Sequence, residues 1–145
     1  MTIFEELRVD HDKQRALIEA LEKTHGDEAE RRDRFAQLKL QLKHHATAEE
    51  RHFYAPLIDH DETVEMSRHG IAEHHDLEEL LAELEEADMS SPGWALRFKT
   101  LKEKILHHFE DEEQGFFQRA GKIFDEHQKA SLGKAYRQEM SDQGI

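Results

Sequence analysis

Histidine and glutamate recur along this 145-residue chain at a spacing that suits metal binding. His45 and Glu49 form one His-x-x-x-Glu motif, and His108 and Glu112 form a second one 63 residues later. Residues four apart lie on the same face of a helix, so each motif can offer an imidazole nitrogen and a carboxylate oxygen together. The chain has no cysteine, which excludes thiolate zinc sites, iron–sulfur clusters and disulfides. Any metal must therefore be held by nitrogen and oxygen.

The two motifs belong to a longer internal repeat. When the chain is shifted along itself by 63 residues, the histidines, glutamates and aromatic residues of one half fall on those of the other. We therefore predict a single domain over residues 1–145, which contains two related helical hairpins at about residues 3–57 and 66–120. The superposed pairs are His11 with His74, His45 with His108, Glu49 with Glu112, Glu50 with Glu113 and Phe53 with Phe116.

The elements that must position these residues are helices. Apolar residues recur three and four positions apart along most of the chain, which is the helical period. Helices are expected at about residues 2–23, 29–54, 63–87 and 92–119, and a shorter fifth helix is expected after Gly121. Short connections between long amphipathic helices favour antiparallel neighbours. The predicted fold is all-α, an antiparallel up-and-down four-helix bundle with a short C-terminal fifth helix.

The motif residues interrupt the apolar stripes of these helices and are therefore predicted to point inward. Leu38, Leu42, His45, Glu49 and Phe53, for example, follow one another at steps of four, three, four and four residues. Buried charged groups persist when they are paired or bound to metal. Six inward residues suit a dinuclear site better than one four-coordinate zinc. The six are His11, His45, Glu49, His74, His108 and Glu112.

Neighbouring polar residues are assigned to other roles. His44, His75 and His107 lie off the apolar stripes and are predicted to face solvent or to support the ligands from outside. Glu113 is expected on a solvated face, and Glu78 is a candidate to orient an imidazole. Without metal, the two inward glutamates are expected to repel one another and to raise the pKa of at least one of them.

The ordered set of residues resembles the hemerythrin-like HHE cation-binding family. The resemblance covers about residues 3–120 and implies a di-iron site between four helices. Relatives use such a site to bind or sense dioxygen, to sense iron, or to handle nitric oxide and peroxide. It rests on His11, on the segment from His45 to Pro56, on the segment from Ala72 to Glu78, and on the segment from His108 to Phe117.

Two positions depart from the oxygen-carrying hemerythrins. Those proteins have His-x-x-x-His on the third helix and His-x-x-x-x-Asp on the fourth, whereas here Gly70 stands four residues before His74 and Glu112 stands four residues after His108. A reversible oxygen carrier is therefore not the expected function. His69 is predicted to supply a further imidazole to the metal site through a π-bulge near Gly70.

The function expected from residues and resemblance together is the binding or sensing of dioxygen, nitric oxide or peroxide in the cytoplasm. The cofactor would be two non-haem iron ions, bridged by Glu49, Glu112 and an oxo or hydroxo group. An enzyme that detoxifies peroxide or nitric oxide, and an iron-sensing or storage module, stay open as alternatives. A ferritin-like site needs a Glu-x-x-His motif in each half of the bundle. Glu49 and His52 form one, but its counterpart in the second half fails, because Gly115 stands three residues after Glu112.

The bulk composition limits the partners. A formal net charge of −13 argues against nucleic acid and anionic lipid, because binding either requires lysine and arginine. No apolar run approaches the roughly 18 residues that a membrane helix needs. We expect a monomer or homodimer whose partners are small oxidants, with neither nucleic acid nor membrane bound.

Overall fold

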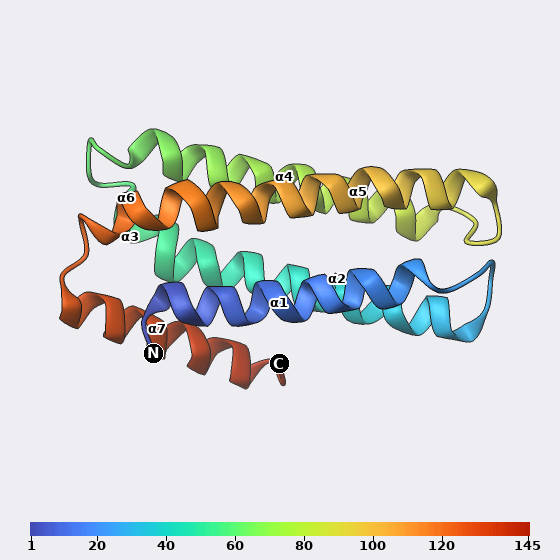
Figure 1. The fold of residues 1–145 in the computed structure, drawn as a ribbon, viewed down its shortest axis with the longest axis horizontal. Helices are drawn as coiled ribbons and strands as arrows, with labels where there is room; N and C mark the ends of the chain where they lie inside the picture. The colour runs from blue at the N-terminus through green and yellow to red at the C-terminus, as the bar shows by residue number, and fades with distance from the viewer.

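The computed structural model describes residues 1–145, and all of its regular elements are helical (Figure 1). Helices α1 and α2 form one hairpin, α4 and α5 form the second, and α7 lies alongside α1 and α2 (Figure 1). The predicted all-α, antiparallel four-helix bundle with a fifth C-terminal helix is confirmed. The elements are α1 (Ile3–Glu22), α2 (Ala29–Glu49), η1 (Glu50–Tyr54), α3 (Ala55–Leu57), α4 (Val64–Glu86), α5 (Pro92–Asp111), η2 (Glu112–Phe116), α6 (Phe117–Gly121) and α7 (Glu126–Asp142).

Local sequence explains where α1 and α7 begin. The side chain of Thr2 accepts a hydrogen bond from the backbone of Glu5, and the Glu5 side chain bonds back to the backbone of Thr2. Asp125 and Gln128 form the same capping box at the start of α7. Each box satisfies backbone N–H groups that have no partner inside the helix. Helices α1 and α7 are far apart in the sequence but packed against one another, and both are thus capped at their N-termini.

Two π-helical segments follow the two His-x-x-x-Glu motifs. η1 begins directly after Glu49, and η2 begins at Glu112. A π-helical turn bonds residue i to i+5, so the inward face moves on by one residue. Phe117 is accordingly buried, while Phe116, which the sequence pattern placed inward, is only partly buried.

The π-bulge predicted near Gly70 is absent. α4 runs as a continuous α-helix from Val64 to Glu86. Gly70 serves a different purpose, because a Cβ atom built there would lie 2.2 Å from Cζ of Tyr54. A glycine at this position lets the tyrosine ring lie directly against the helix backbone.

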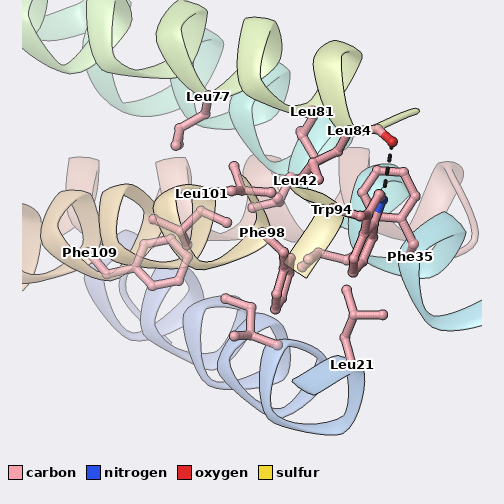
Figure 2. Close-up of a cluster of buried hydrophobic side chains, with 13 residues drawn as sticks. Leu21, Phe35, Leu42, Leu77, Leu81, Leu84, Trp94, Phe98, Leu101 and Phe109 are labelled. Atoms are coloured by element: carbon pink, nitrogen blue, oxygen red, sulfur yellow. Dashed lines mark hydrogen bonds between the residues drawn. The ribbon is translucent and has the colours of Figure 1, made fainter. Parts of the chain in front are cut away.

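The apolar core is divided into two clusters that occupy opposite ends of the bundle. One cluster includes Leu21, Phe35, Trp94 and ten further residues, and the indole N–H of Trp94 donates to the carbonyl of Leu84 (Figure 2). The other gathers residues near the chain's N-terminus, the π segments and α7. The buried polar motif residues lie between the two clusters along each helix. None of the helices is long and apolar enough to cross a membrane.

Candidate metal centre

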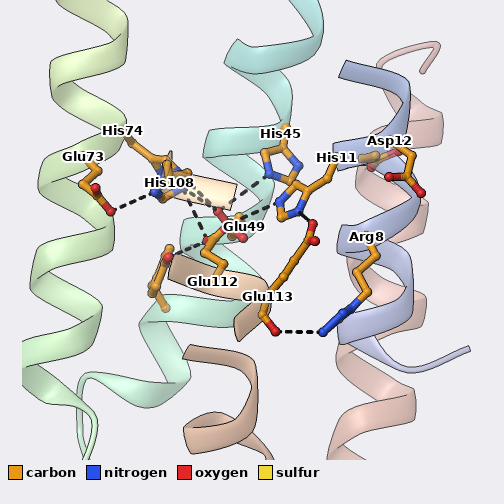
Figure 3. Close-up of polar contacts among 12 residues, drawn as sticks. Arg8, His11, Asp12, His45, Glu49, Glu73, His74, His108, Glu112 and Glu113 are labelled. Atoms are coloured by element: carbon orange, nitrogen blue, oxygen red, sulfur yellow. Dashed lines mark hydrogen bonds and ion pairs between the residues drawn. The ribbon is translucent and has the colours of Figure 1, made fainter. Parts of the chain in front are cut away.

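All six residues predicted to point inward are buried and lie together (Figure 3). Their potential ligand atoms form two groups, and within each group every atom lies within 4.8 Å of the others. Two groups that share both glutamates are the arrangement expected for two neighbouring ions bridged by carboxylates. The first group is His11, His45, Glu49 and Glu112, and the second is His74, His108, Glu49 and Glu112.

The inward atoms of the six residues lack hydrogen-bond partners. This holds for Nε2 of all four histidines, for both carboxylate oxygens of Glu49 and for Oε1 of Glu112. Some of these atoms are nevertheless close, since Nε2 of His74 lies 2.8 Å from Oε1 of Glu49. Buried polar atoms without hydrogen bonds are rare and costly unless another partner is present. Seven such atoms around one point fit the donor set of a metal centre.

The outward nitrogen of each histidine, in contrast, is firmly held. Nδ1 of His11 donates to Glu113 at 2.6 Å, and Nδ1 of His74 donates to Glu50 at 2.9 Å. Arg15 approaches the same carboxylate oxygen of Glu113 at 3.0 Å. A carboxylate at Nδ1 fixes the proton there and leaves Nε2 free to bind a metal.

The remaining two histidines are held in different ways. Nδ1 of His108 lies 3.0 Å from a carboxylate oxygen of Glu73. Nδ1 of His45 lies 2.7 Å from the hydroxyl of Tyr136 on α7, and that hydroxyl donates in turn to Asp10. Because the hydroxyl proton goes to Asp10, the tyrosine oxygen accepts from His45. Again Nε2 is the nitrogen left for a ligand.

A second tyrosine contacts the glutamates of the cluster. The hydroxyl of Tyr54, at the end of η1, donates to Oε2 of Glu112. Burial, together with the nearby Glu112 and Glu49, raises the pKa of Tyr54 well above its ordinary value. The phenol therefore keeps its proton at neutral pH and holds it at Glu112.

The electrostatics of the metal-free centre differ from the expectation based on glutamate repulsion. Burial would raise the pKa of Glu49, but the imidazoles of His108 and His74 outweigh burial and hold it well below its usual range. Burial would lower the pKa of His74, but Glu49 and Glu50 raise it to about 9. Burial dominates at His45, whose pKa is well below the ordinary value. Histidine protons thus compensate the carboxylates when no metal is bound.

His69 lies apart from the six. Its side chain is 60% exposed and lies near Glu73, not near the inward glutamates. His74 lies five positions further along the regular α-helix, and this rotates the two side chains about 140° apart. Only a π-bulge would have brought them onto one face, and α4 has none.

Other residues outside the six fall partly where the sequence suggested. His75 and His107 are largely exposed, His44 is partly buried, and none of the three joins the cluster. The prediction of a solvated face for Glu113 is wrong, because its carboxylate binds His11 and Arg15. The expectation for Glu78 is also wrong, because its side chain is exposed.

The residues that hold Nδ1 were missed by sequence reasoning, although a signal for most of them existed. Glu50 and Glu113 are the second members of the repeated Glu-Glu pair, and Glu73 directly precedes His74. Repetition at a position next to a ligand could have identified the first two. Tyr136 has no counterpart in the repeat, so only the placement of α7 reveals it.

An open cavity of about 580 Å³ leads to the centre between α2 and α4. Apolar side chains such as Leu42, Leu77 and Phe109 line it, and Lys43 and Glu78 are among its polar residues. Three of the clustered histidines line the cavity as well: His45, His74 and His108.

Comparison with known families matches residues 2–120 to the hemerythrin HHE cation binding domain. The chain belongs to this family. This HHE chain is also similar to the crystal structure of a hemerythrin HHE cation binding domain-containing protein from Mycobacterium kansasii. That comparison gives a TM-score of 0.89 at 19% identity, over 99% of this chain and 87% of the other, and it supports the fold alone. No curated protein matches the chain.

The HHE assignment and the geometry support the same coarse conclusion. The chain is a cation-binding domain, and its buried histidine and glutamate cluster could hold metal. Helix α7 lies beyond the matched residues 2–120, yet it contributes Tyr136 to the surroundings of His45.

Proposed function

We propose that this HHE domain holds two non-haem iron ions and binds or senses dioxygen, or a related small oxidant such as nitric oxide or peroxide. The observation that carries the proposal is the convergence of buried ligand atoms without hydrogen bonds, backed by histidines whose other nitrogen is fixed. Four imidazoles would hold the ions, and Glu49 and Glu112 would bridge them, with an oxo or hydroxo group as a further bridge. Nitrogen and carboxylate donors with open positions suit iron.

Iron in such a site supplies reversible electron transfer and an open coordination position for a small ligand. The protein's own part is positioning. Glu113, Glu50 and Glu73 orient three imidazoles from outside, as Tyr136 orients the fourth, and fixed ligands favour a defined metal geometry. Tyr54 keeps a proton at Oε2 of Glu112.

The cavity supports a small-molecule function over iron storage. It opens between α2 and α4 and reaches three of the proposed ligands, so a molecule of a few atoms can approach from solvent. Its apolar walls suit a weakly polar gas such as dioxygen or nitric oxide.

An enzyme that turns over peroxide or nitric oxide at the same centre is the second candidate. The buried phenol of Tyr54 favours it, because it fixes a hydrogen-bond donor next to a proposed bridging carboxylate. Binding and turnover share the same ligands, so kinetics must separate them.

Metal analysis after anaerobic loading with iron, followed by separate addition of dioxygen, nitric oxide and peroxide, tests the proposal. We expect about two iron ions per chain and an optical change with at least one oxidant. A stable adduct supports binding, and continued loss of the oxidant supports the enzyme. Fewer than one iron ion per chain after iron-replete loading would refute the dinuclear site.

A further inference from the structure

The two halves of the metal centre have different electrostatic surroundings. We name the pair His11 and His45 the first-hairpin position and the pair His74 and His108 the second-hairpin position. The pairs are related by the sequence repeat, and they share Glu49 and Glu112. What distinguishes them is the outer layer, by which we mean the residues that contact Nδ1 of each histidine and the charged side chains linked to those residues.

Around the first-hairpin position, every carboxylate in the outer layer is matched by an arginine. Glu113, which holds His11, lies 3.0 Å from Arg15. Asp10 lies 3.2 Å from Arg137, and it reaches His45 only through the neutral phenol of Tyr136. A guanidinium group thus contacts each of these two carboxylates, and the same two arginines also pair with Asp12 and Glu6.

Around the second-hairpin position, the carboxylates have no such partner. Glu50 lies within ion-pair distance of His74 alone, and Glu73 lies within that distance of two histidines alone. Lys43 lines the same cavity as Glu50 but makes no ion pair with it. With neutral histidines, as metal binding requires, this outer layer adds two negative charges.

The sequence repeat contains the substitutions that create this difference. The position of Asp10 in the first half is taken by Glu73 in the second, and the longer side chain reaches its histidine without a tyrosine between them. The position of Arg15 is taken by Glu78, which reverses the charge. Helix α7, which provides Tyr136 and Arg137, packs mainly on the first hairpin.

From these contacts we infer that the two metal positions are unequal and that the second-hairpin position takes the first divalent cation and holds it more tightly. This inference rests on the proposed dinuclear function. A divalent cation is attracted by nearby negative charge that no cationic side chain contacts, and carboxylates behind histidine ligands strengthen their bonds to metal. A neutral phenol behind His45 gives less of this support.

Anaerobic calorimetric titration of the metal-free protein with ferrous iron tests the inference. Two equal positions whose bound ions repel one another would also bind iron in two steps. Variants at each of the two positions therefore decide whether the positions are unequal. Glu73→Gln is expected to weaken the first step by about 10- to 100-fold, the usual effect of removing such an outer partner. Tyr136→Phe should leave the first step within about twofold and weaken the second.

A matched control removes the same charge from the same helix away from the site. Glu79→Gln on α4 changes an exposed side chain and should leave both steps unaltered. Mössbauer spectra with one equivalent of iron-57 give a second readout, since the quadrupole doublet should change in Glu73→Gln and stay constant in Tyr136→Phe. If Glu73→Gln does not fold by circular dichroism, Glu50→Gln replaces it with the same expectation.

The outcomes separate this inference from the proposed function. Equal weakening of the first step by Glu73→Gln and Tyr136→Phe, with two ions still bound by the unaltered protein, would overturn the inequality and leave the dinuclear function intact. Failure of the unaltered protein to bind ferrous iron would overturn both.

Discussion

Replacing Gly70 by alanine should displace Tyr54 from the metal centre. The added Cβ would lie 2.2 Å from Cζ and 2.3 Å from the hydroxyl oxygen of Tyr54, whereas an ordinary contact begins at 3.4 Å. The ring must therefore move by about 1.2 Å, although it is fully buried and its hydroxyl is bonded to Glu112.

The cost follows from three contributions. Overpacking of a core costs about 1 to 3 kcal/mol. Loss of the buried hydrogen bond to Glu112 adds about 1 to 3 kcal/mol. Alanine stabilises the folded state by about 0.5 to 1 kcal/mol relative to glycine, because it favours the helix more. The net loss in free energy of unfolding is about 1 to 5.5 kcal/mol, which lowers the melting temperature of a chain of this size by roughly 3 to 16 °C.

Urea unfolding of the metal-free protein, followed by circular dichroism, measures this loss. Gly115→Ala is the matched control, because a Cβ added at Gly115 meets no atom within 4 Å. In iron-loaded protein, Gly70→Ala should also alter the optical spectrum, since Glu112 loses its phenol partner. Equal stability of Gly70→Ala and Gly115→Ala would show that Tyr54 is not held against α4 as described.

Three further predictions test the centre from other directions. His108→Ala should lose at least half of the bound iron and His107→Ala none, measured by metal analysis, because only His108 points inward; equal losses would contradict the described helix register. The pKa of His74 is raised to about 9 in the metal-free protein, so the stability contributed by its proton is complete below about pH 6.5 and is lost as the pH rises through 9. The melting temperature of the metal-free protein should therefore fall between pH 6.5 and 9. A melting temperature that does not change over this range would contradict the histidine–glutamate pairing. Gln14→Leu, which introduces the residue found at the equivalent Leu77, should stabilise the metal-free protein by about 1 to 3 kcal/mol in urea unfolding, because both polar atoms of the buried amide lack partners. A loss of stability would show that this amide is bonded to water.

Features set by a regular sequence period were predictable. Features that depend on which side chain contacts which neighbouring helix were not. Helical spacing and the repeat placed each of the six residues on the inward face of its own helix, because both signals are regular along the chain. The π segments were not predictable at their true positions, since a π turn leaves no distinct pattern of residue types. The prediction for His69 failed for that reason. The role of Tyr136 depends on how α7 packs on α1 and α2, which no local signal encodes.

The outer layer also explains why metal binding and folding should be coupled in this bundle. On a helix, a residue next to an inward ligand is rotated about 100° from it and so points toward a neighbouring helix. Glu113 thus supports His11 on α1, and Glu73 on α4 supports His108 on α5. Each helix that offers an imidazole is therefore fixed by a carboxylate or phenol from another helix. Two ions that together bind all four imidazoles require all of these contacts at once, so displacement of one helix should weaken binding at the whole centre.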